Sequence, residues 1–141
     1  MDGCGAPLFS STPAGLARAF ARIATAPPGT PEGRVAAAVR AHPWWVAGTG
    51  REVVRLAAAV PGLISKDGAE GVFAAALPDG RAVVLKVLDG SARPVAAVVA
   101  AALRTLGVDE PGLASAGYTP VLGHGDPVGS VEPVVNGSAA G

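Results

Sequence analysis

Two apolar segments joined by a turn constrain the fold of this chain more than any other feature. Residues 71–77 and 81–88 flank Pro78-Asp79-Gly80, and this arrangement predicts a β-hairpin. Both arms contain adjacent apolar residues, such as Val83 and Val84, whose side chains point to opposite faces of a strand. We therefore expect a small antiparallel sheet that helices cover on both sides.

Helical patterns precede and follow the hairpin. Thr12-Pro13 and Thr30-Pro31 each combine an N-cap residue with a proline at the first helical position, so a helix is expected from each proline. A third helix is expected over residues 51–60, after a loop over residues 44–50. Residues 63–66 are expected to form a short strand, and residues 92–106 an amphipathic helix followed by Gly107.

These elements predict an α+β fold with three N-terminal helices, a small antiparallel sheet and a C-terminal helix. We assign this domain to residues 1–108. From Asp109 onward the sequence is rich in Gly, Pro, Ser and Val without a period, which predicts a disordered tail over residues 109–141.

The charge pattern excludes some classes of partner. The 11 Lys and Arg residues balance 11 Asp and Glu residues, and no basic stretch with interleaved aromatic residues favours nucleic acid or an anionic membrane. The longest apolar run, residues 95–103, is too short to span a bilayer. The amino terminus does not resemble a secretory signal, so we expect a cytoplasmic protein.

Lys66, in the segment Ser65-Lys66-Asp67-Gly68, is the main candidate for chemistry. A lysine at a strand end before a glycine-containing turn can project its ammonium into a cleft, as the Lys-Thr-Gly segment of penicillin-recognising enzymes does. By pattern alone, a solvent-exposed lysine without a catalytic role is the simpler interpretation.

Other candidates also have two interpretations. Cys4, between two glycines, is either a metal ligand or reactive thiol or a small buried apolar residue. His42 is either an acid–base group or a residue that ends the preceding helix. The segment Gly48-Thr49-Gly50-Arg51 is either an anion site before a helix or a tight turn.

A nucleophile that would pair with Lys66 or with Lys86, the other lysine of the chain, is missing from the sequence. An acylating serine served by a lysine would form a Ser-x-x-Lys motif, but Leu63 and Val83 stand three residues before Lys66 and Lys86. A Gly-x-Ser-x-Gly segment is absent as well. The chain therefore contains at most half of such a catalytic site.

Five segments together resemble the C-terminal half of the bacterial asparaginase II family of the rhizobial type. They are Asp-Gly-Cys-Gly-Ala-Pro at residues 2–7, Leu-Ala-Arg-Ala-Phe-Ala-Arg at 16–22, Ala-His-Pro-Trp-Trp-Val-Ala-Gly-Thr-Gly-Arg at 41–51, Lys-Asp-Gly-Ala-Glu-Gly-Val at 66–72 and Leu-Lys-Val-Leu-Asp-Gly-Ser-Ala-Arg at 85–93. The resemblance implies a fold similar to serine β-lactamases and glutaminases. It also implies hydrolysis of L-asparagine to L-aspartate and ammonia.

The resemblance further assigns roles to individual residues. Lys66 matches a catalytic lysine that pairs with a second serine, Cys4 matches one ligand of a zinc ion, and Asp2 matches a carboxylate that binds substrate or a zinc-bound water. The serines, their partner lysine and the other zinc ligands belong to the N-terminal half, which we expect to be missing. We therefore expect an inactive fragment whose partner is that half, a full-length homologue or a second copy.

Two other functions stay open at this stage. The chain could be a non-catalytic interaction module that pairs with a separate N-terminal half, which a co-purifying partner would support. It could also be a small-molecule binder with a residual amino-acid site, which calorimetry with asparagine and aspartate would detect.

Overall fold

The first two helices begin where the Thr-Pro pairs predict. In the computed structural model, which describes residues 5–135, α1 spans Pro13–Thr25 and α2 spans Pro31–Ala41. The Thr12 hydroxyl accepts a hydrogen bond from the Gly15 amide at 3.0 Å, and the Thr30 hydroxyl accepts one from the Gly33 amide at 3.1 Å. These bonds satisfy amide groups that a helix start leaves without a partner.

One short helix lies where the sequence analysis placed a loop. Helix α3 spans Pro43–Ala47 and α4 spans Glu52–Ala59, so four helices, not three, precede the sheet. Pro43 occupies the first turn of α3, where its fixed φ suits a helix and its missing amide is not needed. Gly48, with φ of 88°, ends α3 after little more than one turn, which is too short to produce a helical period in the sequence.

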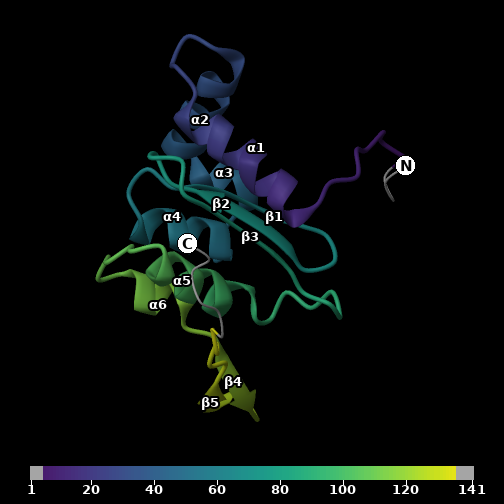
Figure 1. Ribbon diagram of the computed structural model, residues 1–141. Coiled ribbons are helices and arrows are strands. Elements are labelled where there is room, and N and C mark those ends of the chain that lie inside the picture. The colour runs from purple at the N-terminus through teal and green to yellow at the C-terminus, as the bar shows by residue number, and fades with distance from the viewer. Residues whose placement is uncertain (1–4, 136–141) are drawn as a thin grey trace.

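The predicted hairpin is confirmed. Strands β1 (Ile64–Gly68), β2 (Val72–Ala76) and β3 (Ala82–Lys86) form an antiparallel sheet in the order β1-β2-β3 (Figure 1). In the β2–β3 turn, the Asp79 carboxylate accepts a hydrogen bond from the Arg81 amide at 3.0 Å. Gly80 has φ of 91°, a conformation that glycine adopts without steric cost.

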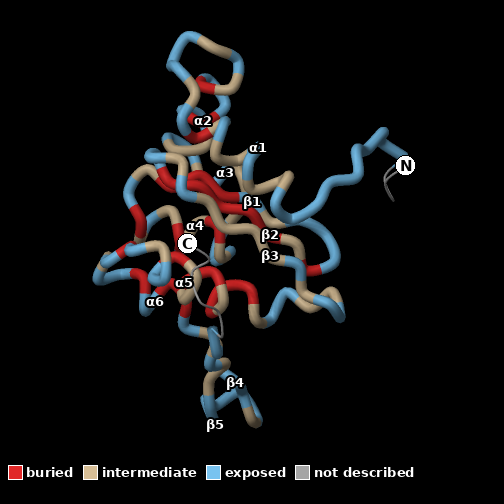
Figure 2. Tube along the Cα trace, in the orientation of Figure 1, coloured by how far each residue is buried: buried red, intermediate tan, exposed pale blue. Residues whose placement is uncertain are grey.

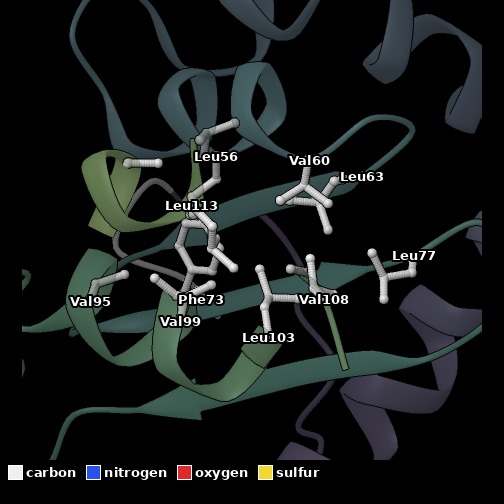
Figure 3. Packing of buried hydrophobic residues seen from close by; sticks show 14 residues of the cluster. Leu56, Val60, Leu63, Phe73, Leu77, Val95, Val99, Leu103, Val108 and Leu113 are labelled. Atoms are coloured by element: carbon white, nitrogen blue, oxygen red, sulfur yellow. The ribbon is translucent and has the colours of Figure 1, made fainter. Parts of the chain in front are cut away.

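Helices cover both faces of the sheet, as the apolar pattern of the hairpin predicts. On one face, Phe73 of β2 is fully buried among residues of α4, of α5 (Val95–Thr105) and of the following segment (Figure 3). On the other face, α1 and α2 pack on Ile64 and Ala76 through the small residues Ala24 and Ala36. The large core therefore lies on the α5 face, and a smaller, alanine-rich core lies on the α1 face.

Regular structure continues beyond residue 108, where the sequence analysis placed the start of a disordered tail. Helix α6 spans Leu113–Gly117, and β4 (Pro120–Gly123) pairs with β5 (Asp126–Ser130). Leu113 is fully buried in the large core, whereas the β4–β5 hairpin is largely exposed (Figure 2). A single helical turn has too few residues to show a period, so burial of α6 could not be predicted from the pattern.

The described residues thus form an α+β arrangement of six helices, a three-stranded sheet and a two-stranded sheet. Among residues 5–135, every helix is too short or too polar to cross a membrane.

Candidate functional site

Lys66 lies within β1, not at its end. The strand continues to Gly68, which pairs with Val72, and Lys66 itself pairs with Ala74 of β2. The turn that follows is therefore formed by residues 69–71, in which Glu70 and Gly71 have positive φ. Since β1 is an edge strand, the side chain of Lys66 can still reach solvent, and it is 51% exposed.

Asp67 connects the Lys66 ammonium to a second cation. Lys66 Nζ donates to the Asp67 carbonyl at 2.8 Å and also to Asp67 Oδ1. Arg51 Nη2 donates to Asp67 Oδ2 at 2.8 Å and lies 3.6 Å from Glu52 Oε1. Arg51 is the N-cap of α4 and precedes β1 by many residues in the sequence. The ion pairs of Asp67 with Arg51 and Lys66 therefore link the start of α4 to the candidate lysine.

The carboxyl of Asp67 is kept ionised by these neighbours. Burial by itself raises the pKa of Asp67, but the hydrogen bond from Lys66 and the charges of Lys66 and Arg51 outweigh burial and hold the pKa below its usual value. The resulting carboxylate fixes the position of the Lys66 ammonium at the outer edge of the sheet.

Ser65 is the buried polar residue of this region, and the sequence analysis did not single it out as a candidate. Its side chain is 3% exposed, and Oγ has no hydrogen-bond partner among the described residues. Because side chains alternate along a strand, Ser65 points to the opposite face of β1 from Lys66. Ser65 is therefore not placed to be the serine that Lys66 would serve.

An apolar cavity of about 200 Å³ lies between the first three helices and β1. Its walls come from α1, α2, α3 and β1, and the lining residues are Phe20, Ile23, Val35, Val39, Val46, Ile64, Ser65 and Lys66. Such a lining offers few partners for the charged amino and carboxylate groups of a free amino acid. A polar substrate bound near Lys66 would need further groups from outside these residues.

Lys86, the other lysine, lies at the opposite edge of the same sheet. It ends β3, pairs with Val72 of β2, and its Nζ donates to the carbonyls of Glu70 and Val87 at 2.5 Å each. Among residues 5–135, neither lysine ammonium is hydrogen-bonded to a serine hydroxyl. The structure therefore does not bring the two lysines together into one site.

The segment from His42 to Arg51 forms turns around α3. The His42 amide donates to the Ala38 carbonyl at 3.0 Å and is the C-cap of α2. Gly48 and Gly50 both have positive φ, which is consistent with a tight turn before α4. Trp44 Nε1 donates to Thr49 Oγ1 at 2.9 Å.

The two remaining predicted site residues, Asp2 and Cys4, lie outside the described residues. Within residues 5–135, His, Cys, Asp and Glu side chains form no group of three or more that could hold a metal ion.

Comparison with known protein families identifies the family of this chain. The sequence model of the family described as L-asparaginase II matches residues 1–133. No curated protein matches the chain.

Proposed function

The chain belongs to the L-asparaginase II family, and from this membership we propose that it is part of an enzyme that hydrolyses L-asparagine to L-aspartate and ammonia. The match over residues 1–133 is the observation that carries this proposal, since it includes every candidate residue named above. In the proposed reaction, a serine attacks the side-chain amide carbon, ammonia leaves, and water releases aspartate from the acyl-enzyme.

We assign Lys66 the role of the lysine that exchanges a proton with a second serine. Its ammonium lies at the edge of β1, where a hydroxyl from another segment or chain can approach it. The bonds that the Lys66 ammonium donates to Asp67, which also accepts from Arg51, support this role because they hold the ammonium in one position. We place the nucleophile outside this chain because its sequence lacks Ser-x-x-Lys, and no serine of residues 5–135 is hydrogen-bonded to Lys66.

Zinc and substrate binding by the amino-terminal segment are part of the same proposal. Cys4 would supply one thiolate and Asp2 a carboxylate near the substrate, while the other zinc ligands would come from outside this chain. When bound, zinc would supply a positive charge near the substrate. We also propose a cytoplasmic location, where the Cys4 thiol would stay reduced.

The first test is ammonia release from L-asparagine by the purified chain with zinc present. We expect negligible turnover, because the nucleophile and most positioning groups are not in this chain. Turnover close to that of a full-length member of the family would refute the claim that the chain is inactive alone.

The second test supplies the missing part. The chain is co-expressed with the N-terminal part of a full-length family member that carries Ser-x-x-Lys, and ammonia release is measured on the purified complex. We expect Lys66→Ala to lower kcat at least about 100-fold, and Lys86→Ala, its matched control at the other sheet edge, to change kcat less than about threefold. The opposite result would transfer the catalytic role to Lys86.

A second function, a non-catalytic interaction module, is favoured by one observation. Trp44 and Trp45 form an edge-to-face pair with ring centroids 5.2 Å apart, yet they are 51% and 80% exposed. Exposed tryptophans are typical of interface cores. If the chain acts only as a module, Trp45→Ala will weaken capture of the same N-terminal part at least about tenfold, while the complex releases no ammonia.

A further inference from the structure

Arg51 reaches the candidate lysine site through Asp67. Its Nη2 donates to Asp67 Oδ2 at 2.8 Å, while the Lys66 ammonium donates to Oδ1 of the same carboxylate. The two cations thus share one carboxylate, with one cation at each oxygen. The segment from Gly48 to Arg51 is a turn before α4, and the proposed function assigns Arg51 no role of its own.

The contact between Lys66 and Asp67 depends on how the carboxylate is turned. Neighbouring residues of a strand direct their side chains to opposite faces of the sheet, so the side chains of Lys66 and Asp67 start on different faces of β1. The lysine reaches its neighbour around the outer edge of β1, where its ammonium also donates to the Asp67 carbonyl at 2.8 Å. The carboxylate meets the ammonium only if it is directed to the same edge.

Arg51 directs the Asp67 carboxylate to this edge. The two oxygens of a carboxylate are fixed relative to each other, so a bond at Oδ2 determines where Oδ1 can lie. The Asp67 side chain is 22% exposed, compared with 49% for Arg51 and 51% for Lys66. A carboxylate that is largely withdrawn from water needs partners from the protein, and the two cations are those partners.

The turn before α4 holds Arg51 in place. Arg51 is the N-cap of α4, but its side chain makes no capping hydrogen bond, so the guanidinium can extend to β1. The Gly48 amide donates to the Trp44 carbonyl at 2.7 Å, and Trp44 Nε1 donates to Thr49 Oγ1 at 2.9 Å. Glu52 Oε1 lies 3.6 Å from Arg51 Nη2 and is a second carboxylate beside the guanidinium.

We propose that Arg51 is a positioning residue, which acts through Asp67 to hold the Lys66 ammonium where a second serine exchanges a proton with it. This inference rests on the proposed function, because it uses the role assigned to Lys66. Arg51 takes no part in the proton exchange itself, since a guanidinium stays protonated in proteins. Its contribution is the geometry of Asp67.

The effect of Arg51 is expected to be larger on catalysis than on stability. Half-exposed ion pairs stabilise a fold only slightly, so Arg51→Met is expected to change the midpoint of thermal unfolding by less than about 5 °C, measured by circular dichroism. The rate is more sensitive to position, because a displacement of about 1 Å can lower it about 100-fold. A variant that stays folded can therefore lose much of its activity.

The order of the Lys66 ammonium can be measured on this chain without any reaction. The chain has two lysines, so Lys86→Arg assigns their two Nζ resonances in a nitrogen NMR spectrum. We expect the order parameter of Lys66 Nζ to fall by at least about a third in Arg51→Met. Arg55→Met, which should leave this order parameter unchanged, is the matched control. Arg55 is also exposed, lies one turn further along α4 and donates to the Tyr118 carbonyl at 3.5 Å.

Ammonia release by the complex with the co-expressed N-terminal part tests the consequence for catalysis. We expect Arg51→Met to lower kcat at least about tenfold and to change KM less than about threefold, because it displaces a reacting group and not the substrate. Arg51→Lys keeps a charge that can reach Asp67 and is expected to retain at least about a third of the native kcat. Arg55→Met should leave both constants within about twofold of their native values. In a Lys66→Ala background, Arg51→Met should have no further effect, since the two residues act as a unit.

These measurements separate the inference from the proposed function. A less ordered Lys66 ammonium together with a lower kcat in Arg51→Met supports the positioning role. An unchanged order parameter or an unchanged kcat overturns it while leaving the role of Lys66 intact. An equal loss in the Lys66→Ala background also overturns it, because Arg51 would then act independently of the lysine. If Lys66→Ala leaves kcat unchanged, or if the complex with the native chain releases no ammonia, the proposed function fails first and this inference fails with it.

Discussion

At the scale of single residues, Asp67 determines where the candidate lysine lies. Its two carboxylate oxygens contact different cations, Lys66 and Arg51, and its carbonyl accepts a further bond from Lys66. The sequence shows these three residues but not their contact, because Arg51 and Asp67 are brought together only by the packing of α4 beside β1.

The lowered pKa of Asp67 makes stability depend on pH. A carboxyl whose folded pKa lies below its unfolded value, about 3.9, stabilises the fold above that value, and this contribution is lost as the pH falls through the folded pKa. We expect Asp67→Asn to lower the free energy of unfolding by up to about 1 kcal/mol at pH 7 and to have a smaller effect at about pH 2. Urea unfolding at both pH values measures this, with Asp126→Asn as control, and an equal effect at both values would contradict it.

Gly71 is required by the β1–β2 turn. Its φ is +66°, and a Cβ at this position would lie 2.7 Å from Val87 Cβ and 3.0 Å from the Ser91 carbonyl oxygen. We expect Gly71→Ala to lower the free energy of unfolding by about 1–3 kcal/mol in urea titrations, through strain and overpacking.

Gly129→Ala is the matched control for this substitution. A Cβ at Gly129 meets nothing within 4 Å, so its effect is expected to stay within about 0.5 kcal/mol. Equal effects of the two substitutions would show that the turn does not require glycine at residue 71.

At the scale of elements, local sequence signals determine where most helices and strands begin. Three such signals each specify the structure of only the next few residues, and the structure confirms all three. They are Thr12-Pro13, Thr30-Pro31 and Pro78-Asp79-Gly80. Helices α3 and α6 were not predicted, because five residues are too few to establish a period and their stability comes from packing.

The cap of α2 can be tested by itself. Thr30→Ala removes the oxygen that accepts from the Gly33 amide and is expected to lower the free energy of unfolding by about 1 kcal/mol. Thr30→Ser keeps that oxygen and should behave nearly as the native chain. Thermal melts followed by circular dichroism compare the two, and equal losses would exclude the capping bond as the cause.

At the scale of the whole molecule, the large core includes residues that follow α5. Leu113 of α6 is fully buried in the same cluster as Leu56 of α4 and Val99 of α5 (Figure 3). The compact part of the chain thus extends past residue 108, where the sequence analysis ended the domain.

Two leucines test this extension. Leu113→Ala creates a cavity in the core and is expected to lower the free energy of unfolding by about 2–5 kcal/mol. Leu122→Ala, on β4 with the leucine side chain 58% exposed, is expected to cost less than about 0.5 kcal/mol. Chemical denaturation measures both, and a small effect of Leu113→Ala would show that α6 is not part of the core.

The sequence by itself determined the hairpin, the capped helices, the α+β class and, through the order of its motifs, the resemblance to the asparaginase II family. These features depend on neighbouring residues or on the order of motifs along the chain. Both can be recognised without knowing which residues are in contact. It also determined that Ser-x-x-Lys is absent from this chain, since that motif is defined by spacing alone.

Only the tertiary structure decided that Lys66 lies within an edge strand and is held by Asp67 next to Arg51. It also decided that Ser65 faces away from Lys66 and that α6 belongs to the core. The physical reason is that each of these facts depends on contacts between segments far apart in sequence, and such contacts form only when the helices and strands pack.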